Sequence, residues 1–508
     1  MPTPRISASS YSNTAPLIWS FLYGANRGRF ELILDNAPAR SAELLQQKRV
    51  DAALVPIIEY QRIENVRLVP DVCVGAKERV RKTQQTMVKE QVREFLKESE
   101  TCLHCRRKRL SKGKHRIVYR TLFGKMELDS PRFFYCGCEL ENESAKTKTF
   151  SPLARALPER TSPEMLYLEA KFGARISFEL SRQLLAEVLP LHDELNHATI
   201  RNHLHRIGER LEGELSEDKE IFIEGCPRDW ANLPRPDLPL TVGIDGGYVH
   251  SNNPKSRPEG WFEMIVGKSI KADGTAKCFG FVCGLDRKPR RRLYQVLQSQ
   301  GMQMNQQVTF LSDGGETVRE LQYYLNPQSE HLLDWFHITM RLTVMMQMTR
   351  GLENTELKEL ILPMIESAKW YLWHGNVVSA LEKIEDGWCF LDTEIPTLKE
   401  LKLQKAVKDF QIYIENNAAM ITNYGERYRN GEAIATGFVE SAVNQIIAKR
   451  FVKKQPMRWT KRGAHLLLQV RVKVLNEELQ ENFSKWYPQF EIKKDTETEN
   501  SGELALAV

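Results

Sequence analysis

Two short segments of this sequence contain the same triplet, Asp-Gly-Gly, within a run of apolar and β-branched residues. Asp245 stands in residues 241–249 and Asp313 in residues 307–316. Such runs are typical of buried strands, where a lone carboxylate is costly unless a cation or hydrogen bonds compensate its charge. Two strands that each deliver a carboxylate therefore predict a divalent-metal site for phosphoryl chemistry.

A third carboxylate is expected from a late helix, and Glu440 fits this place. Thr436, Glu440 and Asn444 recur at i, i+4 and i+8, which predicts a polar stripe beside an apolar helical face. A solvated helix charge is the alternative interpretation of Glu440 taken alone. The two Asp-Gly-Gly strands favour the metal site.

Periodicity predicts the elements that position these acids. In order, they are strands at 260–269 and 277–285 joined by an Asp273-Gly274 turn, a helix at 289–298, the Asp313 strand, a helix at 316–324, a strand at 331–334 and a helix from Phe336. This is the element order of an RNase H-like mixed sheet, in which the acids of the first and fourth strands lie side by side. We expect the core in residues 241–337 and 431–485, separated by a mostly helical insertion at 338–430.

Four cysteines in two close pairs precede this core. Cys102 and Cys105 form one pair and Cys136 and Cys138 the other, and the residues between them predict a hairpin that would bring the pairs together. Four thiolates so arranged indicate a structural Zn²⁺ site within a module at residues 77–150. Four free thiols are the alternative, because the second pair is separated by one residue rather than two.

A helical region is predicted at residues 151–226. Ser177 and Asn196 are candidate N-caps of two helices, and Pro190 ends the first one. The second helix carries Arg201 and Arg206, so the pair resembles a helix-turn-helix for DNA binding, with a plain αα-hairpin as the alternative. A Pro-rich linker at 227–240 follows, and residues 486–508 are expected to form a disordered tail.

The net charge of +6 is modest, but basic residues are clustered. Three runs without acids, at 106–120, 287–292 and 449–462, indicate a polyanionic partner. The residues expected to contact DNA in the first and last runs are Arg106, Arg107, Lys108, Arg109, Arg450, Lys453, Lys454, Arg458 and Trp459. No run approaches the ~18 apolar residues of a membrane span, and nine cysteines do not suggest a disulfide framework. We expect a cytoplasmic, nucleoid-associated protein.

Residues from about 90 to 485 resemble bacterial insertion-sequence transposases of the DDE type with a helical insertion. The matching motifs are Gly-Ile-Asp-Gly-Gly at 243–247, Leu-Ser-Asp-Gly-Gly at 311–315, Asp-Trp-Phe-His at 334–337 and Gly-Phe-Val-Glu-Ser at 437–441. The resemblance implies that Asp245, Asp313 and Glu440 bind two Mg²⁺ (or Mn²⁺) ions and catalyse DNA cleavage and strand transfer on double-stranded terminal repeats and target, as a homo-oligomer on DNA.

Three further polar residues of these motifs are expected to support the triad or to contact DNA. They are Asp334, His337 and Asn444. For Asp334, the alternative interpretation is an ordinary helix N-cap.

The first 76 residues resemble a different family. Ser-Ser-Tyr-Ser-Asn-Thr-Ala-Pro at 9–16 and the segment at 51–60 are similar to chorismate dehydratase of the futalosine route to menaquinone, which has a periplasmic-binding-protein-like α/β fold. The resemblance would place Asn13 in a substrate cleft. Because it stops near residue 76, we expect a remnant fused in frame to the transposase, without dehydratase activity, and Met87 as an alternative start.

The fold class expected overall is therefore multi-domain α/β. Three other functions compete with the transposase. They are a chorismate dehydratase, which the missing second lobe disfavours, a non-catalytic DNA-binding protein, which the triad disfavours, and an RNase H-like nuclease without strand transfer, which the sequence does not separate from a transposase.

Overall fold

The computed structural model describes most of the chain, in two compact units. The described residues are 4–9, 28–35, 38–53, 72–140, 148–191, 195–215, 240–252, 260–271, 273–303, 306–325, 329–393, 395–452 and 457–490. One unit comprises Met1–Leu166 and Arg182–Asn196, and the other comprises Tyr167–Ser181 and His197–Val508. Asn13, Lys453, Lys454, nearly all of the predicted linker and residues 491–508 lie outside the described residues.

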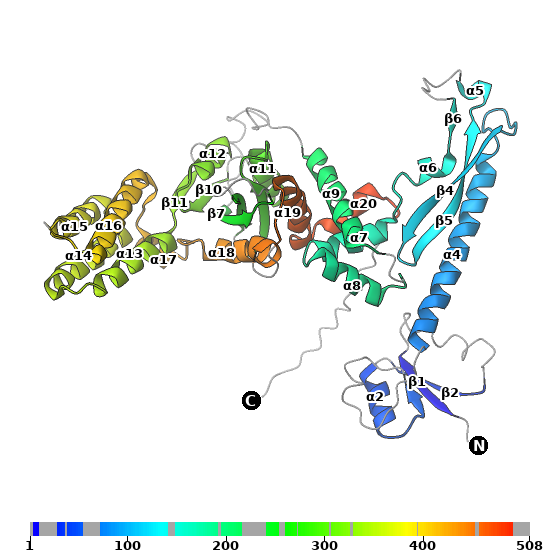
Figure 1. Cartoon of the computed structure of the whole chain (residues 1–508), viewed down its shortest axis with the longest axis horizontal. Coiled ribbons are helices and arrows are strands. Elements are labelled where there is room, and N and C mark those ends of the chain that lie inside the picture. The colour runs from blue at the N-terminus through cyan, green and yellow to red at the C-terminus, as the bar shows by residue number, and fades with distance from the viewer. Residues whose placement is uncertain are drawn as a thin grey trace. The chain divides into compact units, whose positions relative to one another are not determined.

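The N-terminal part of the first unit is a small parallel sheet with a helix beside it (Figure 1). The strands are β1 (Arg5–Ser9), β2 (Glu31–Asp35) and β3 (Ala52–Ala53), in the order β2-β1-β3, and the helix is α2 (Pro38–Gln46). Ser7 donates a hydrogen bond of 3.0 Å from its buried hydroxyl to Ser41 of α2. This arrangement confirms an α/β segment here.

The rest of this unit is a long helix and a hairpin. Helix α4 (Val72–Ser99) precedes β4 (Ser111–Thr121) and β5 (Gly124–Phe134), which pair antiparallel as expected. Three short elements follow, namely α5 (Gly137–Leu140), β6 (Thr149–Phe150) and α6 (Pro152–Ala156). The core of the hairpin contains Ile117, Met126, Leu128 and Leu153, with Val88, Val92 and Leu96 of α4 packed against it. Helix α6, expected with the helical region, therefore packs with the hairpin.

The second unit contains a mixed sheet of five strands. These are β7 (Leu240–His250), β8 (Trp261–Ile270), β9 (Ala276–Val282), β10 (Val308–Ser312) and β11 (Glu330–Leu333). Their order is β11-β10-β7-β8-β9, with β7, β8 and β9 antiparallel to one another and β10 and β11 parallel to β7. The predicted strands and the multi-domain α/β class are confirmed.

Each face of this sheet is covered by helices. Helices α11 (Pro289–Ser299) and α12 (Glu316–Leu325) pack on one face, where Val242 and Ile244 of β7 enter the core. On the other face lie α18 (Gly437–Val443), the π-helix Asn444–Val452 and α19 (Lys461–Leu475). Because side chains alternate along a strand, residues 243, 245 and 247 of β7 face the α18 side.

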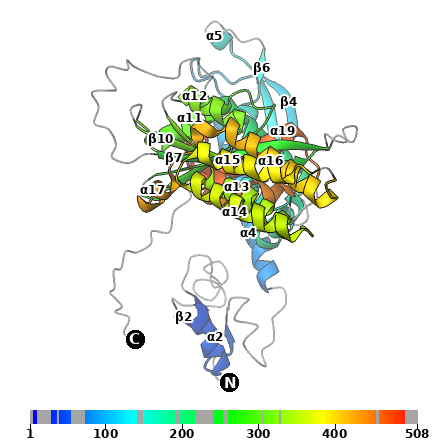
Figure 2. The same ribbon diagram turned by 90° about the vertical axis from the view of Figure 1, so that its left-hand side faces the viewer.

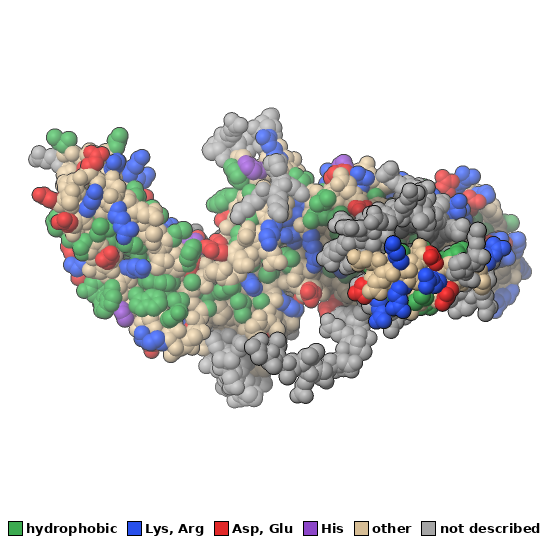
Figure 3. Space-filling model, turned by 90° about the horizontal axis from the view of Figure 1, so that it is seen from below, with side chains coloured by type: hydrophobic (Ala, Val, Ile, Leu, Met, Phe, Trp, Pro, Cys, Tyr) green, Lys and Arg blue, Asp and Glu red, His purple; other side chains and the backbone are tan. Residues whose placement is uncertain are grey.

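The insertion is a helical bundle, as predicted. Helices α13 (Trp335–Arg350), α14 (Thr355–Trp373), α15 (Val377–Leu391) and α16 (Leu398–Asn416) lie side by side in Figure 2 around a core that includes Leu342, Ile361 and Phe410, and α17 (Tyr424–Arg429) completes it. Apolar side chains also gather on the surface over this part in Figure 3. None of the described helices is long and apolar enough to cross a membrane.

The remaining helices include the pair expected to form a helix-turn-helix. They are α7 (Pro163–Gly173), α8 (Phe178–Val188), α9 (His197–Glu214) and α20 (Leu479–Trp486). Ser177 caps α8 as predicted, accepting a 3.1 Å hydrogen bond from the Leu180 N–H. Helix α9 packs along α19, so closely that a Cβ on Gly208 would lie 2.7 Å from the Leu466 carbonyl. DNA binding by this helix pair stays a prediction.

The start of the predicted disordered tail is ordered. Phe490 is only 3% exposed, and its ring lies 5.4 Å from the rings of both Tyr167 and Phe483. Burial of this aromatic side chain offsets the entropy of ordering residues 486–490, so the prediction was wrong for these residues.

Candidate active site

The sheet register brings Asp245 and Asp313 to one place. Leu311 of β10 pairs with Gly243 of the parallel strand β7, and each aspartate follows two residues later. Asp313 is exposed, whereas Asp245 is half-buried and accepts a 2.7 Å hydrogen bond from the Gly246 N–H. Burial raises the pKa of Asp245, and the nearby charges of Asp313 and Asp334 raise it further, against the opposing effects of Gly246 and His337. Clustered carboxylate oxygens are suitable ligands for Mg²⁺.

A hydrogen-bonded turn positions Asp313 after β10. The buried Ser312 hydroxyl lies 2.7 Å from His331 Nε2 of β11 and accepts a 3.1 Å hydrogen bond from the Gly314 N–H. Gly314 has φ +93°, and a Cβ there would lie 2.3 Å from the Asn417 side chain, so this turn requires glycine. The pattern in the sequence gave no indication of His331.

Helix α18 crosses β7 on the face that carries Asp245. A Cβ on Gly243 would lie 2.1 Å from Val439 of α18, and one on Gly247 would lie 2.9 Å from Ile447 of the π-helix that follows, so the glycines permit the close approach of both helices. Asp245 lies between these glycines, and Glu440 follows Val439 as a half-buried residue. Among the described residues, the oxygens of the three acids are not all within 4.8 Å of one another. The fold therefore brings the three elements together, but the oxygens of the three acids do not form a complete set of metal ligands.

Asp334 links the strand β11 to helix α18. It is fully buried and caps α13 by accepting a 2.9 Å hydrogen bond from the Phe336 N–H. It also accepts hydrogen bonds from the Thr436 N–H (3.0 Å), from the Thr436 hydroxyl and from His337 Nδ1 (2.5 Å). The N-cap interpretation is thus confirmed, and full burial contradicts direct DNA contact by Asp334. Its place is to hold Thr436, which immediately precedes α18.

Asp334 and His337 shift each other's pKa in the direction that favours the charged form of each. Burial tends to raise the pKa of Asp334, but hydrogen bonds from His337 and Thr436 outweigh it and hold the pKa below its usual value. The hydrogen bond to Asp334 raises the pKa of His337 against the effect of burial, and the charges of Asp245 and Asp313 add to the rise. Both shifts favour the charged forms of Asp334 and His337.

The predicted polar stripe on α18 does not form one face. Thr436 is buried, Glu440 is half-buried and Asn444 is exposed at the start of the π-helix. A π-helix changes the angular spacing of side chains, and the sequence pattern assumed a continuous α-helix. Asn444 stays a predicted supporting or DNA-contacting residue.

Two of the predicted DNA-binding residues lie in the core. Arg450 is 1% exposed, lies 4.8 Å from the Phe178 ring and 5.3 Å from the Trp459 ring, and donates a 3.1 Å hydrogen bond to the Gly173 carbonyl. Burial, and to a smaller extent Arg471, lowers the pKa of Arg450 to about 9. Trp459 is 5% exposed, and its backbone bonds to His250 and Asn252. Neither can contact DNA in this state, because aromatic and backbone partners enclose both.

The other predicted DNA contacts are more accessible. Arg106, Arg107, Arg201, Arg206 and Arg458 are exposed. Lys108 is exposed but lies 3.1 Å from Glu100, and Arg109 donates to the carbonyls of Ser99 and Thr101. In the middle basic run, Arg292 is buried and bonded to Glu212 and Asp286.

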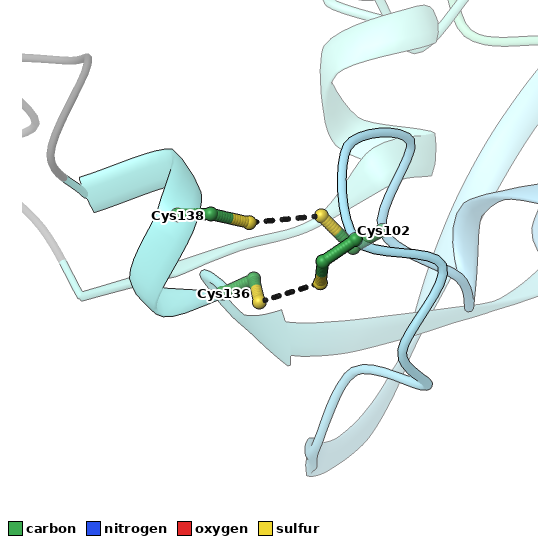
Figure 4. Close-up of side chains that lie close together, drawn as sticks. Cys102, Cys136 and Cys138 are labelled. Carbon is green, nitrogen blue, oxygen red and sulfur yellow. Dashed lines mark hydrogen bonds between the residues drawn. The ribbon is translucent and has the colours of Figure 1, made fainter.

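The four predicted zinc ligands are gathered into one cluster (Figure 4). The Sγ atoms of Cys102 and Cys138 are 3.5 Å apart, those of Cys105 and Cys136 are 3.3 Å apart, and all four lie within 4.8 Å. A tetrahedral zinc with Zn–S bonds of about 2.3 Å has sulfur separations of about 3.8 Å, so the donor set fits Zn²⁺. The contacts with Cys102 and then Cys136 raise the pKa of Cys138 to about 12.

A second group of ligand-type side chains was not foreseen. Glu212, Asp286 and His465 lie within 4.8 Å of one another. The guanidinium of Arg292 is bonded to both acids, at 2.9 Å each, and to Gln469 at 2.6 Å. The cation is thus supplied by the protein itself, and no local sequence pattern joins residues so far apart.

The N-terminal segment is similar to a known protein family. Residues 4–99 match the model of a family described as menaquinone biosynthesis. These 96 residues (4 to 99) are less than a fifth of the 508-residue chain. The match confirms the N-terminal resemblance and extends past the expected boundary at residue 76 to the end of α4.

Among the curated proteins no match was found. A solved structure, the Drosophila P element transposase strand transfer complex, is similar over 67% of this chain and 96% of its own, at 11% identity and a TM-score of 0.28. A score of this size does not define a shared fold.

Proposed function

We propose that this protein is a DNA transposase that binds element ends and catalyses metal-dependent strand cleavage and strand transfer through Asp245, Asp313 and Glu440. The observation that carries the proposal is the register of β7 and β10, which sets Asp245 beside Asp313 on a strand that α18 crosses. The strand order β11-β10-β7-β8-β9 is that of an RNase H-like sheet and supports the same proposal.

Asp245, Asp313 and Glu440 would together hold Mg²⁺. The chemistry that Mg²⁺ would supply at these carboxylates is activation of a water or a 3′-hydroxyl and stabilisation of the leaving oxygen. Burial, and to a smaller extent the charges of Asp313 and Asp334, raises the pKa of Asp245, and a cation held beside these carboxylates would offset both effects. His337 Nδ1 bonds to Asp334, which leaves Nε2 to orient a phosphate oxygen.

DNA is the substrate class that the accessible basic residues favour. Arg201 and Arg206 on α9 and Arg106 and Arg107 in the zinc-binding module are exposed, and such residues bind the phosphate backbone. The Cys102, Cys105, Cys136 and Cys138 cluster would hold one structural Zn²⁺. Homo-oligomerisation on DNA, a cytoplasmic site of action and the domain boundaries form part of the same proposal.

The test is cleavage and joining of plasmid DNA that carries the sequences flanking the reading frame. In Mg²⁺, we expect Asp245→Asn, Asp313→Asn and Glu440→Gln each to reduce cleavage by at least ~10²-fold, because each loses positioning and charge neutralisation, while DNA binding survives. Glu263→Gln is the matched control, since Glu263 pairs with Tyr248 on the opposite face of the sheet and should retain cleavage. Near-normal cleavage by Glu440→Gln would remove that residue from the site.

The assay also separates the closest alternative. A nuclease without strand transfer would nick and release DNA but form no joined product with a target plasmid. The family match at residues 4–99 favours a second candidate, chorismate dehydratase activity of the N-terminal segment. We do not prefer it, because a substrate cleft needs enclosing walls and the described strands here form only a small three-stranded sheet.

A further inference from the structure

A basic cavity lies on the zinc-bearing module. It has a volume of about 550 Å³ and is formed by the start of β4, the end of β5, β6 and α6. Its charged or ionisable nitrogen-bearing side chains are Lys112, Lys114, His115, Arg132 and Arg155, and none of its described lining residues is acidic. These residues are distant in sequence, and the hairpin and β6 bring them together.

Two of these side chains, Lys114 and Arg155, have partners within the protein. Lys114 pairs with Asp129 at 2.8 Å. The Arg155 guanidinium lies 5.4 Å from the Tyr135 ring and 5.0 Å from the Phe150 ring, and it bonds to the Tyr135 hydroxyl. Arg155 is thus fixed in place without being neutralised.

Lys112 and Arg132 complete the positive surface. Both are exposed, and within the described part of the chain neither has an acidic partner within 4.0 Å. Removing a phosphate from water is favourable where several cations meet it and one is preorganised. The cavity therefore suits an anion rather than a neutral ligand.

The aromatic residues argue for a phosphate backbone rather than for a base or an acidic peptide. Phe150 contacts Arg155, Arg109 and Tyr135, with ring centroids of the aromatic pair 4.7 Å apart. A ring so surrounded has little face left for stacking a base or for anchoring an apolar peptide side chain.

We propose that this cavity binds a phosphodiester of double-stranded DNA, through Lys112, Arg132 and Arg155, independently of sequence. The choice of DNA as the polyanion rests on the proposed function, whereas the anion site itself does not. The site differs from the acidic centre at Asp245 and from the exposed arginines near Cys105, and it gives the zinc-binding module a direct part in holding DNA.

The experiment measures DNA binding by the full chain over a range of salt concentrations, without Mg²⁺, using a fluorescent duplex. We expect the Lys112→Ala/Arg132→Ala variant to bind more weakly and to reduce the slope of log K against log salt by about 1.8, roughly 0.9 for each lost phosphate contact. Arg132→Lys should retain most of the slope. Arg116→Ala is the matched control, because Arg116 neighbours His115 on the same strand but does not line the cavity and is paired with Glu127.

The outcomes separate the possibilities. An unchanged slope in the double variant, or an equal loss in Arg116→Ala, overturns the inference, provided zinc content and circular dichroism match the unaltered protein. Loss of binding to single-stranded RNA alone, or to an acidic peptide alone, also overturns the choice of DNA. A wild-type protein that binds through this cavity but cleaves no DNA contradicts the proposed function and leaves the cavity assignment intact.

Discussion

The protonation of His331 shows how one buried side chain can make the stability of the folded protein depend on pH. Burial lowers the pKa of His331 to about 4, and the charge of Arg319 adds to the effect. The neutral ring is bonded to Ser312, which in turn holds the turn of Asp313. In the unfolded chain the same residue binds a proton near pH 6.5. Below that pH the unfolded state gains protons that the folded state does not accept.

The resulting prediction concerns stability between pH 6.5 and 4. The unfolded state binds more protons in this window, so the free energy of unfolding should fall as the pH falls, by up to ~3 kcal/mol from His331 alone. Urea unfolding of the full chain and of His331→Gln, compared at pH 7 and pH 4.5, measures this contribution. The substituted protein should lose less stability on acidification; an equal loss in both proteins would contradict the prediction.

At the scale of elements, one buried carboxylate joins the strand β11, the helix α13 and the start of α18. Asp334 accepts hydrogen bonds from Phe336, His337 and Thr436, and its position fixes where α18 begins relative to the sheet. Because Glu440 lies on α18, Asp334 would be a positioning residue for the proposed triad.

Asp334→Asn keeps the volume but replaces the charged acceptor. We expect the pKa of His337 to fall toward its ordinary value, cleavage to decrease at unchanged DNA affinity, and stability to fall by ~3 kcal/mol, as for other broken buried pairs. An NMR titration of His337 reports an effect that loss of stability alone would not produce. Thr436→Val, which removes one donor and keeps the size, should cost less, ~1–2 kcal/mol. A His337 pKa that does not move in Asp334→Asn would refute the coupling.

The geometry of the cysteine cluster leads to a further prediction at this scale. We expect about one Zn²⁺ per chain, and Cys105→Ser should release it and weaken DNA binding, because structural zinc contributes to folding. Metal analysis and the binding assay measure both effects. Cys389→Ser is the control, since Cys389 is an exposed cysteine of α15 outside the cluster. Freshly purified protein without zinc would rule out the site.

At the scale of the whole molecule, the N-terminal segment and the rest of the chain have different relationships to known proteins. Residues 4–99 match a menaquinone biosynthesis family. The last part of these residues, the C-terminal half of α4, packs its Val88, Val92 and Leu96 against the β4–β5 hairpin. The small sheet β2-β1-β3 keeps its own contacts with α2.

We therefore expect residues 1–86 to be dispensable for transposition. A chain that begins at Met87 retains the α4 side chains that cover the hairpin and should cleave DNA within about twofold of the full chain, although it loses the hydrogen bonds of Gln85 to the Phe123 and Lys125 carbonyls. The full chain should consume no chorismate. Chorismate turnover by the full chain, or loss of cleavage by the shorter one, would show that the segment contributes function.

The sequence by itself was enough to predict the strands of the mixed sheet, the hairpin, the helical insertion and the grouping of the four cysteines. These features depend on local periodicity and close spacing. Asp245 and Asp313 could be singled out because an acid within an apolar strand is conspicuous wherever the strand is placed. The N-terminal resemblance was also visible in short motifs, and the family match confirmed it.

Only the tertiary structure decided which charged residues face solvent. Arg450 and Trp459 lie in a basic run that resembles a DNA-binding surface, yet packing against Phe178 and Gly173 places them in the core. Asp334 and Thr436 are separated by 102 positions but share hydrogen bonds, and Lys112, Arg132 and Arg155 form one cavity only after β4, β5 and β6 pair. Burial and electrostatic partnership depend on contacts between distant segments, and local sequence patterns do not encode those contacts.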